Sequence, residues 1–356
     1  MKIVTIIGAR PQFIKASALS KLIKKQKKIK EIIIHTGQHY DYEMSKIFFN
    51  QLKIPKPKYN LNIKSNYHGE MTGKMVIEIE KVLLKEKPDY TIVYGDTNST
   101  LAGALASKKL CIPVIHIEAG LRSFSKNMPE EINRVLTDHC SDILFTPSKL
   151  AGQNLKKEGF SKNSIIRVGD IMYDVFLTFF NKLKKNKITY DIVVTIHRPE
   201  NTNSKTKMLN IIQNLNDLSH KYSILFPIHP RTKKILEKYK ILKLLSKKIK
   251  VTKPMSYKNI LYYLKFANLL ITDSGGMQKE AFFSKTQTLT IRDETEWPET
   301  VFANWNTLVQ PIKSKIYNLT LERIFLKGKK IKLYGNGNCS KIIFKTLKKI
   351  SKVKSE

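Results

Sequence analysis

The chain is poor in cysteine and in acidic residues, and it has no long apolar run. Its three cysteines, Cys111, Cys140 and Cys339, form no CxxC pair and are odd in number. This pattern argues against a disulfide framework or a zinc site and favours a reducing, cytoplasmic compartment. No apolar run reaches the roughly 18 residues that would indicate a membrane span. The N-terminus has no signal-peptide cleavage pattern and is expected to form a strand.

Basic residues are abundant instead. The chain has 64 lysines and arginines but 29 aspartates and glutamates, which gives a net charge of +35. Such a charge is compatible with nucleic-acid binding. The lysines, however, are spread over many segments and do not alternate with aromatic residues along one stripe. We therefore expect a generally basic surface that can attract an anionic substrate, and no nucleic-acid partner.

Length and periodicity predict two domains. The chain has 356 residues, 42% of them hydrophobic, which is comfortable for two cores. Apolar runs typical of buried parallel strands alternate with segments of helical periodicity, and the pattern restarts after the Lys-rich residues 179–190. The alternation implies an α/β fold with two doubly wound, Rossmann-like domains. The expected domains are 1–175 and 176–335, and a helix within 336–356 is a candidate for packing back on the first domain.

Three acidic residues are candidates for chemistry. Asp96 and Glu118 each follow an apolar run, and Glu130 lies beside Pro129 at an expected helix start. Ligands of open α/β sheets bind beyond the carboxyl ends of the strands, so acids placed there can transfer protons. Simpler roles stay open for two of them. Asp96 can cap the next helix, and Glu130 can form an i,i+4 pair with Arg134.

Two turns have the character of phosphate sites. In DSGGMQKEA, Ser274 can cap a helix whose first residues, Gly275 and Gly276, leave backbone N–H groups accessible; such a helix N-terminus binds phosphate. Glu280 can accept hydrogen bonds from ribose hydroxyls. A capped helix with an acid near its start would explain the same residues without a ligand.

The first strand ends in GARPQFIK, where Gly8 permits a tight turn and close approach of a ligand. Arg10 and Lys15 flank the start of the next helix and make a plausible phosphate clamp. The basic composition favours a simpler interpretation of Lys15 as an exposed surface lysine. His197 and His229 each follow an apolar run, so each can be an acid, a base or a phosphate donor, or a structural hydrogen-bonding residue. Neither shows metal-ligand spacing.

Together these motifs resemble one family, the non-hydrolysing UDP-N-acetylglucosamine 2-epimerases, which have a glycosyltransferase-B-like fold of two domains facing a cleft. The resemblance covers nearly the whole chain, from GARPQFIK through TGQHYD, VYGDTNST, HIEAGLRSF, MPEEINR, IHRPEN, HPRT and DSGGMQKEA to RDETEWPE. Each motif alone is weakly specific, whereas their order and spacing are highly specific.

The resemblance implies inversion at C2 of a UDP-2-acetamido sugar, from UDP-GlcNAc to UDP-ManNAc, for surface polysaccharide synthesis. UDP is eliminated to give a 2-acetamidoglucal and is then added back with the opposite configuration at C2. A base removes the C2 proton, and an acid returns one to the other face. No metal or cofactor is implied. A homodimer is expected by resemblance.

Family positions carry over residue by residue. The resemblance assigns catalytic roles to Asp96, Glu118, Glu130 and His197. It assigns substrate binding to a second set, namely Arg10, Lys15, Gln38, His39, Arg134, His229, Ser274, Gly275, Gly276 and Glu280.

Two positions depart from the typical family pattern. Gln12 replaces a glutamate, and Trp297 replaces an arginine. Both resemble the subgroup that acts on UDP-2,3-diacetamido-2,3-dideoxyglucuronate. Loss of a negative charge at residue 12 would reduce repulsion of a C6 carboxylate. The diacetamido uronate is therefore an alternative substrate. A UDP-sugar glycosyltransferase is a further alternative, because fold does not dictate function.

Overall fold

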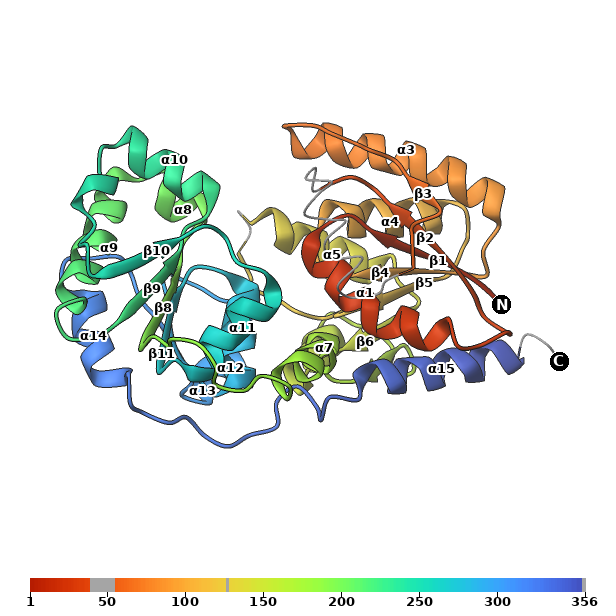
Figure 1. Cartoon of the computed structure of the whole chain (residues 1–356). Coiled ribbons are helices and arrows are strands. Elements are labelled where there is room, and N and C mark those ends of the chain that lie inside the picture. Colours follow the sequence, from red (N-terminus) through yellow and green to blue (C-terminus); the bar gives the residue numbers. More distant parts are fainter. Residues whose placement is uncertain (39–54, 126–127, 354–356) are drawn as a thin grey trace. The chain divides into compact units, whose positions relative to one another are not determined.

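The computed structural model describes residues 1–38, 55–125 and 128–353 (Figure 1). The chain divides into two compact units. Unit 1 comprises Met1–Val175 with Lys332–Glu356, and unit 2 comprises Phe176–Ile331. The helix α7 (Ile171–Phe180) spans the point where unit 1 passes into unit 2.

Unit 1 contains a seven-stranded parallel sheet in its described residues, with strand order β3-β2-β1-β4-β5-β6-β7. The strands are β1 (Lys2–Ile7), β2 (Lys30–His35), β3 (Tyr59–Asn60), β4 (Tyr90–Tyr94), β5 (Val114–Ile117), β6 (Ile143–Thr146) and β7 (Ile165–Arg167). The helices are α1 (Arg10–Ile23), α3 (His68–Glu86), α4 (Asn98–Lys109), α5 (Pro129–His139), α6 (Lys149–Lys157) and α15 (Cys339–Val353).

Unit 2 contains a six-stranded parallel sheet with strand order β10-β9-β8-β11-β12-β13. Its strands are β8 (Ile192–Thr195), β9 (Ile224–Pro227), β10 (Ile249–Thr252), β11 (Leu269–Thr272), β12 (Gln287–Thr290) and β13 (Asn306–Leu308). Its helices are α8 (Pro199–Thr202), α9 (Lys205–Leu218), α10 (Pro230–Lys238), the 3₁₀ turn η1 (Leu242–Leu244), α11 (Tyr257–Phe266), α12 (Gly275–Ser284), α13 (Pro298–Phe302) and α14 (Lys315–Arg323).

These two sheets confirm the predicted α/β fold with doubly wound units. In each sheet the chain moves outward on one side of the first strand and then returns to build the other side. The order reverses between β1 and β4 in unit 1 and between β8 and β11 in unit 2. Ligands of such sheets bind outside the carboxyl ends of the strands at this switch point. The loops after β1, β4, β8 and β11 are therefore the places to look for a site.

Each unit has its own core. In unit 1, apolar strand residues such as Ile6 and Val93 pack against α3 and α4. A Cβ on Gly103 of α4 would lie 2.7 Å from Ile6 Cδ1, so only glycine lets this helix lie so close to the sheet. In unit 2, strand residues pack against α9 and α14 in a second continuous cluster. A separate core in each unit is typical of a chain built from two domains.

The C-terminal helix α15 belongs to unit 1 and lies beside α1 (Figure 1). The carboxylate of Asp174 accepts hydrogen bonds from the backbone N–H groups of Cys339 and Ser340, at 3.0 and 2.7 Å, and thus caps the helix. The thiol of Cys339 donates to Gly169 O at 3.1 Å. Within the part of the chain that the structure describes, no helix has the length and apolarity needed to cross a bilayer.

Candidate active site

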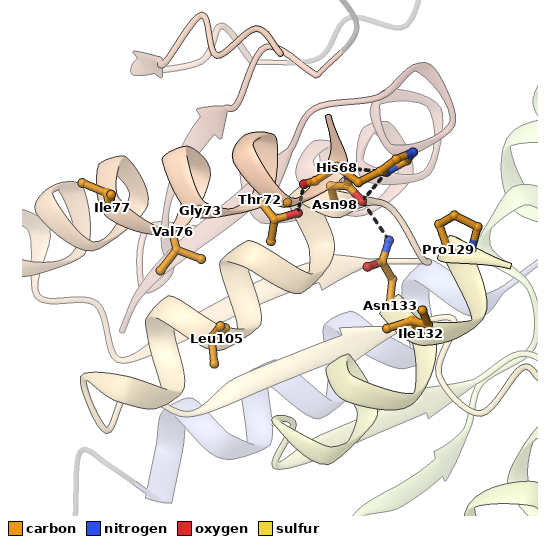
Figure 2. Close-up of a pocket in the computed structure, with 11 residues that line it drawn as sticks. His68, Thr72, Gly73, Val76, Ile77, Asn98, Leu105, Pro129, Ile132 and Asn133 are labelled. Atoms are coloured by element: carbon orange, nitrogen blue, oxygen red, sulfur yellow. Dashed lines mark hydrogen bonds between the residues drawn. The ribbon is translucent and has the colours of Figure 1, made fainter. Parts of the chain in front are cut away.

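A cavity of about 620 Å³ opens between α3, α4 and α5 of unit 1 (Figure 2). Its described lining is largely apolar, with polar groups from His68, Asn98 and Asn133 and no lysine or arginine. A diphosphate needs cations or free backbone N–H groups. This cavity therefore does not provide a phosphate site, and the strand-end loops are the better candidates.

Glu118 follows β5, and its carboxylate forms a short ion pair with the ammonium group of Lys15 from α1. Both side chains are buried. A Cβ on Gly95, the residue before Asp96, would lie 3.1 Å from Lys15 Nζ and 3.2 Å from Glu118 Oε2. The structure thus brings Lys15, Glu118 and the Asp96 loop together. The expectation of an exposed Lys15 is wrong, because its amphipathic side chain is drawn inward to neutralise a buried carboxylate.

The backbone of Glu118 has a φ of 78°. This left-handed conformation is uncommon for a residue with a Cβ, and it stores strain where it occurs. The N–H groups of Glu118 and Ala119 both donate to Phe145 O of β6, at 3.0 Å each, which holds the turn. The strained turn aims the carboxylate at Lys15 instead of along the strand.

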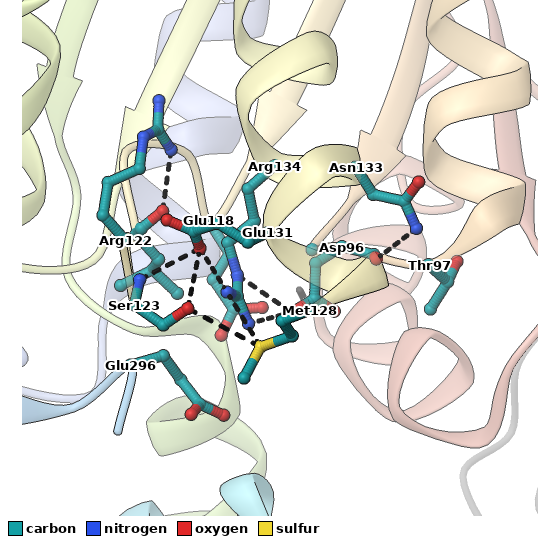
Figure 3. A network of polar contacts seen from close by, with 12 residues as sticks. Asp96, Thr97, Glu118, Arg122, Ser123, Met128, Glu131, Asn133, Arg134 and Glu296 are labelled. Atoms are coloured by element: carbon teal, nitrogen blue, oxygen red, sulfur yellow. Dashed lines mark hydrogen bonds and ion pairs between the residues drawn. The ribbon is translucent and has the colours of Figure 1, made fainter. Parts of the chain in front are cut away.

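Asp96 follows β4 and pairs with the guanidinium of Arg134 from α5 (Figure 3). Arg134 Nη2 and Nε donate to Asp96 Oδ2 at 2.8 and 3.1 Å. The cap of α4 is Thr97, whose hydroxyl accepts from Thr100 N. The interpretation of Asp96 as a helix cap is therefore wrong, because the next residue takes that role.

Arg134 also donates to Glu131 Oε2 at 2.6 Å. Glu131 is buried and accepts from the backbone N–H groups of Ser123 and Phe124, at 2.9 and 2.8 Å, so it ties α5 to the loop after β5 (Figure 3). Among the described residues, no hydrogen bond or ion pair of the Glu130 side chain is found, and Glu130 is half-buried on the first turn of α5. The possible i,i+4 pair of Glu130 with Arg134 is not formed, because Asp96 and Glu131 occupy the guanidinium.

A fully buried polar network lies beneath the two acid-bearing loops. Asp138 Oδ1 lies 2.6 Å from His116 Nδ1, and Asp138 Oδ2 accepts from Gly120 N at 3.0 Å and from Arg122 Nη1 at 2.8 Å. His116 Nε2 lies 2.8 Å from Gly95 O and donates to it. Burial opposes ionisation of Asp138, but the hydrogen bonds and charges of His116 and Arg122 outweigh it and lower its pKa. The network joins Gly95, next to Asp96, to Gly120, which follows Glu118 and Ala119.

Gln12 is completely buried at the start of α1. Its amide oxygen accepts from Gly8 N and Ala9 N at 2.8 and 3.0 Å, and its amide nitrogen donates to Tyr94 O and Thr100 Oγ1 at 2.9 Å each. A carboxylate could not donate to Tyr94 O. An amide at residue 12 is thus favoured because its oxygen and its nitrogen both have partners within the protein.

Other predicted residues of unit 1 contact groups of the protein or lie outside the described residues. A Cβ on Gly8 would lie 2.0 Å from Thr36 Oγ1 and 2.2 Å from Ser99 Oγ, so the glycine makes room for two hydroxyl groups. The amide oxygen of Gln38 accepts from Ser99 N and Oγ at 3.1 and 2.7 Å. His39 and the side chain of Arg10 lie outside what the structure describes.

In unit 2, Asp273 ties the ends of β8 and β11 together. It is completely buried and accepts from the backbone N–H groups of His197 and Arg198, at about 3 Å, and from Asn201 Nδ2 at 3.2 Å. His197 Nδ1 lies 3.3 Å from Asp273 Oδ1, and 38% of the His197 side chain is exposed. Burial lowers the pKa of His197 despite this carboxylate, which favours a neutral imidazole.

His229 follows β9 and is the cap of α10. Its Nδ1 accepts from Arg231 N at 3.2 Å, so the proton of the neutral ring is on Nε2. Its ring centroid lies 5.5 Å from that of His197. The two predicted histidines of unit 2 therefore lie side by side at the carboxyl edge of the sheet. In the described residues, no group of three or more His, Cys, Asp or Glu side chains could hold a metal ion.

The helix α12 begins after β11 as predicted, with Ser274 as its cap. The hydroxyl of Ser274 accepts from Met277 N at 3.5 Å. A Cβ on Gly275 would lie 2.1 Å from Glu296 Oε1, whereas a Cβ on Gly276 would meet nothing within 4 Å. Gly276 thus leaves open space at the first turn, and Glu280 is buried farther along the same helix.

Trp297 is buried beside Lys279 of α12. The Lys279 ammonium lies 4.0 Å from the centroid of the Trp297 ring, in cation–π geometry. An arginine at residue 297 would place a second cation against Lys279. Nearby, Arg292 pairs with Glu296 at 2.8 Å. A tryptophan at residue 297 therefore suits a lysine at residue 279, because the ring attracts the ammonium group that an arginine would repel.

Three residues that hold the site together were not predicted from the sequence, namely Glu131, Asp138 and Asp273. Each is a buried acid in a chain with few acids. Asp273 directly follows an apolar run, as Asp96 does, and this signal could have identified it. Asp138 lies within a helix, 22 positions after His116, and no local pattern connects the two.

Comparison with known proteins gives one consistent family. The profile of a family described as UDP-N-acetylglucosamine 2-epimerase matches residues 21–348. A UDP-N-acetylglucosamine 2-epimerase homolog of Methanococcus maripaludis is 50% identical, over 98% of this chain and 100% of that protein. The UDP-2,3-diacetamido-2,3-dideoxy-D-glucuronate 2-epimerase of Pseudomonas aeruginosa is 48% identical, with the same coverage of both chains.

Solved structures agree with these matches. The crystal structure of Methanocaldococcus jannaschii UDP-GlcNAc 2-epimerase, in complex with UDP-GlcNAc and UDP, matches with a TM-score of 0.91 and 45% identity. The match covers 98% of this chain and 100% of that one. The likeness therefore extends over both units and is not confined to one nucleotide-binding fold.

Proposed function

Because the chain belongs to the UDP-N-acetylglucosamine 2-epimerase family, we propose that it is an isomerase that inverts C2 of a UDP-2-acetamido sugar without hydrolysing it. The observation that carries the proposal is the pair of acids at the carboxyl ends of β4 and β5. Asp96 and Glu118 each lie against a buried cation, Arg134 and Lys15 respectively. Charged groups held in this way are preorganised for proton transfer.

The reaction needs two proton-transfer groups and a stabilised leaving group. Removal of the C2 proton and cleavage of the C1–O bond would release UDP and leave a 2-acetamidoglucal. Re-addition of UDP to C1, with a proton delivered to the other face of C2, would give the epimer. We assign the two proton transfers to Asp96 and Glu118, and we place Glu130 farther from the reacting carbon.

Unit 2 supplies the features that suit a nucleoside diphosphate. The first turn of α12 has open space at Gly276, and the positive end of the helix dipole points there. His197 and His229 lie together at the same edge of the sheet and can donate hydrogen bonds as neutral rings. We infer that the diphosphate binds at the start of α12, with Glu280 available to the ribose hydroxyls.

We propose UDP-GlcNAc as the substrate and UDP-ManNAc as the product, which would serve as a precursor of surface polysaccharide. A specific observation favours UDP-2,3-diacetamido-2,3-dideoxyglucuronate as a second candidate. The Lys279–Trp297 pair replaces the arginine that is typical of the family at residue 297, and a named diacetamido-uronate epimerase is 48% identical. The buried amide of Gln12 carries less weight, because its neighbours explain it.

The test is to incubate the purified protein in D₂O with each UDP-sugar and follow the reaction by NMR. An epimerase using the glucal route incorporates deuterium at C2 and forms the C2 epimer. A glycosyltransferase leaves C2 protonated, and that result with both sugars would overturn the proposal. Conversion of the diacetamido uronate alone would identify the second substrate while keeping the reaction.

The family also suggests an assembly and a compartment. We propose a homodimer, the commonest symmetric oligomer, which sedimentation analysis would test. We propose a cytoplasmic location, which accords with cysteines that form no disulfide. Fractionation of cells that produce the protein at natural levels would check this location.

A further inference from the structure

The loop that follows α14 (Figure 1) carries exposed basic and apolar side chains. In residues 325–331 the side chains of Phe325, Leu326 and Ile331 are 70%, 47% and 47% exposed. Three exposed lysines, Lys327, Lys329 and Lys330, lie between Leu326 and Ile331. We call residues 325–331, together with Phe302, the basic-apolar segment.

The basic-apolar segment is held against the body of unit 2. Lys329 N donates to Ala303 O at 2.8 Å, and Trp305 Nε1 donates to Lys329 O at 3.0 Å. A Cβ on Gly328 would lie 2.6 Å from Trp305 Cδ1, so the chain can lie this close only with a glycine. These contacts fix the backbone of the segment. Its apolar side chains remain exposed to solvent and do not pack into the core of unit 2.

Phe302 extends the surface. It is 74% exposed at the end of α13 and immediately precedes Ala303, to which the segment is bonded. At the other end, the ring of Phe325 lies 6.4 Å from that of Tyr222, centroid to centroid. Several large apolar side chains exposed along one short loop and the helix end bonded to it mark a candidate interaction surface.

The topology places this surface at the sheet edge opposite the one where we place the nucleotide. Tyr222 precedes β9 and Trp305 precedes β13, so the segment crosses the amino edge of the parallel sheet of unit 2. His197, His229 and Ser274 follow strands of the same sheet and lie at its carboxyl edge. A partner bound to the segment would therefore leave that edge accessible.

We propose that the basic-apolar segment binds an anionic lipid bilayer, with Phe302, Phe325, Leu326 and Ile331 entering the interface and the three lysines contacting lipid phosphates. Lysines beside apolar side chains match a bilayer, which is negatively charged outside and apolar beneath. A nucleic acid is a poorer match, because two of the four apolar side chains are aliphatic and cannot stack on bases as aromatic rings do. The proposal is independent of the reaction at C2.

The test is sedimentation with vesicles of phosphatidylcholine, alone or mixed with phosphatidylglycerol. We expect binding to the mixed vesicles only, weakened by added salt. Replacing the three lysines in K327Q/K329Q/K330Q should weaken binding roughly 100-fold, because each lysine near an anionic surface contributes about five-fold. The variant F325S/L326S keeps every charge, and its affinity for the mixed vesicles should fall at least about ten-fold.

The chain offers a matched control. Lys24, Lys25 and Lys27 are exposed, and no exposed apolar side chain lies among them. K24Q/K25Q/K27Q removes the same charge and should change binding less than about three-fold. Thermal unfolding of each variant checks that the fold is retained.

Four results would overturn the proposal. One is failure of the wild-type protein to bind mixed vesicles. The second is an equal loss of binding in the two lysine variants, and the third is no loss of binding in F325S/L326S; each of these would indicate a general effect of the basic surface. The fourth is stronger binding to poly(A) RNA than to mixed vesicles at the same ionic strength.

Discussion

At the scale of single residues, the two candidate acids share one arrangement. Each carboxylate lies against a buried cation, Lys15 for Glu118 and Arg134 for Asp96. Burying a charge is costly unless a partner and hydrogen bonds compensate it. Glu131 holds the second cation from its other side. Each carboxylate is thus held in place by charged side chains from other elements.

We expect Asp96→Asn and Glu118→Gln each to lower kcat by roughly 10²- to 10⁴-fold, because each removes a proton-transfer group. UDP affinity should change little, since we place the nucleotide on unit 2. Turnover measured by NMR and UDP binding measured by calorimetry check the two parts. The matched control is Glu130→Gln, which should have a smaller effect. Near-normal turnover in both acid variants would contradict the assigned roles.

Asp138 makes a pH-dependent contribution to stability. Its folded-state pKa is lowered below the ordinary 3.8, because its bonds with His116 and Arg122 outweigh burial. A lowered pKa stabilises the fold fully above the ordinary pKa, and this contribution is lost as the pH falls through the folded pKa. Asp138→Asn should therefore lower the free energy of unfolding by about 3–5 kcal/mol at neutral pH, as expected when one partner of a buried ion pair is removed.

Urea unfolding of the wild-type protein and of Asp138→Asn at a series of pH values measures this contribution. The difference between the two free energies of unfolding should be constant near neutral pH and should narrow below the ordinary carboxyl pKa. Glu78→Gln is a suitable control, because Glu78 makes an exposed pair with Lys81 and such pairs contribute little. A difference that grows on acidification would contradict the sign.

At the scale of elements, the start of α12 shows how two adjacent glycines differ. A Cβ on Gly275 would collide with Glu296 Oε1 at 2.1 Å, whereas a Cβ on Gly276 would enter open space. Glu296 is held by Arg292 and cannot move away without breaking that pair. Gly275 is therefore needed for packing, and Gly276 keeps the helix N-terminus open.

We expect Gly275→Ala to destabilise unit 2 by about 1–3 kcal/mol through overpacking. Gly276→Ala should leave stability nearly unchanged and weaken UDP binding, because its methyl group enters the space at the first turn. Thermal unfolding and calorimetric titration with UDP separate the two effects. Equal behaviour of the two variants in both measurements would contradict this account.

At the scale of the whole molecule, the described residues form hydrophobic clusters that lie within unit 1 or within unit 2. The C-terminal helix α15 packs on unit 1, and Asp174 caps its N-terminus. Units with separate cores unfold as separate cooperative transitions when the contacts between them are weaker than those within them.

We therefore predict two calorimetric transitions. UDP at about 100 times its Kd should raise the unfolding free energy of unit 2 by about 2.7 kcal/mol and leave that of unit 1 nearly unchanged. Gly276→Ala serves as a control, since its smaller UDP-induced shift would identify the transition of unit 2. A single transition, or an equal shift of both, would contradict the independence of the units.

Much of the architecture could be predicted from local pattern. Apolar runs and helical periodicity are properties of adjacent residues, so they indicated the parallel α/β fold, the cap of α12 at Ser274 and the order of the motifs. Some elements have only weak patterns, among them the short strand β3 and the helix α6, whose sequence KLAGQNLKK has few apolar residues.

The amino-acid sequence alone was sufficient for the fold class and the family, because both depend on periodicity and on the spacing of motifs along the chain. Only the folded chain decided which charges meet. Lys15 and Glu118 are separated by 103 positions, and Asp96 and Arg134 by 38. Composition favoured an exposed Lys15, and a capping role for Asp96 stayed open, but the fold brings a buried cation to each carboxylate from a different element.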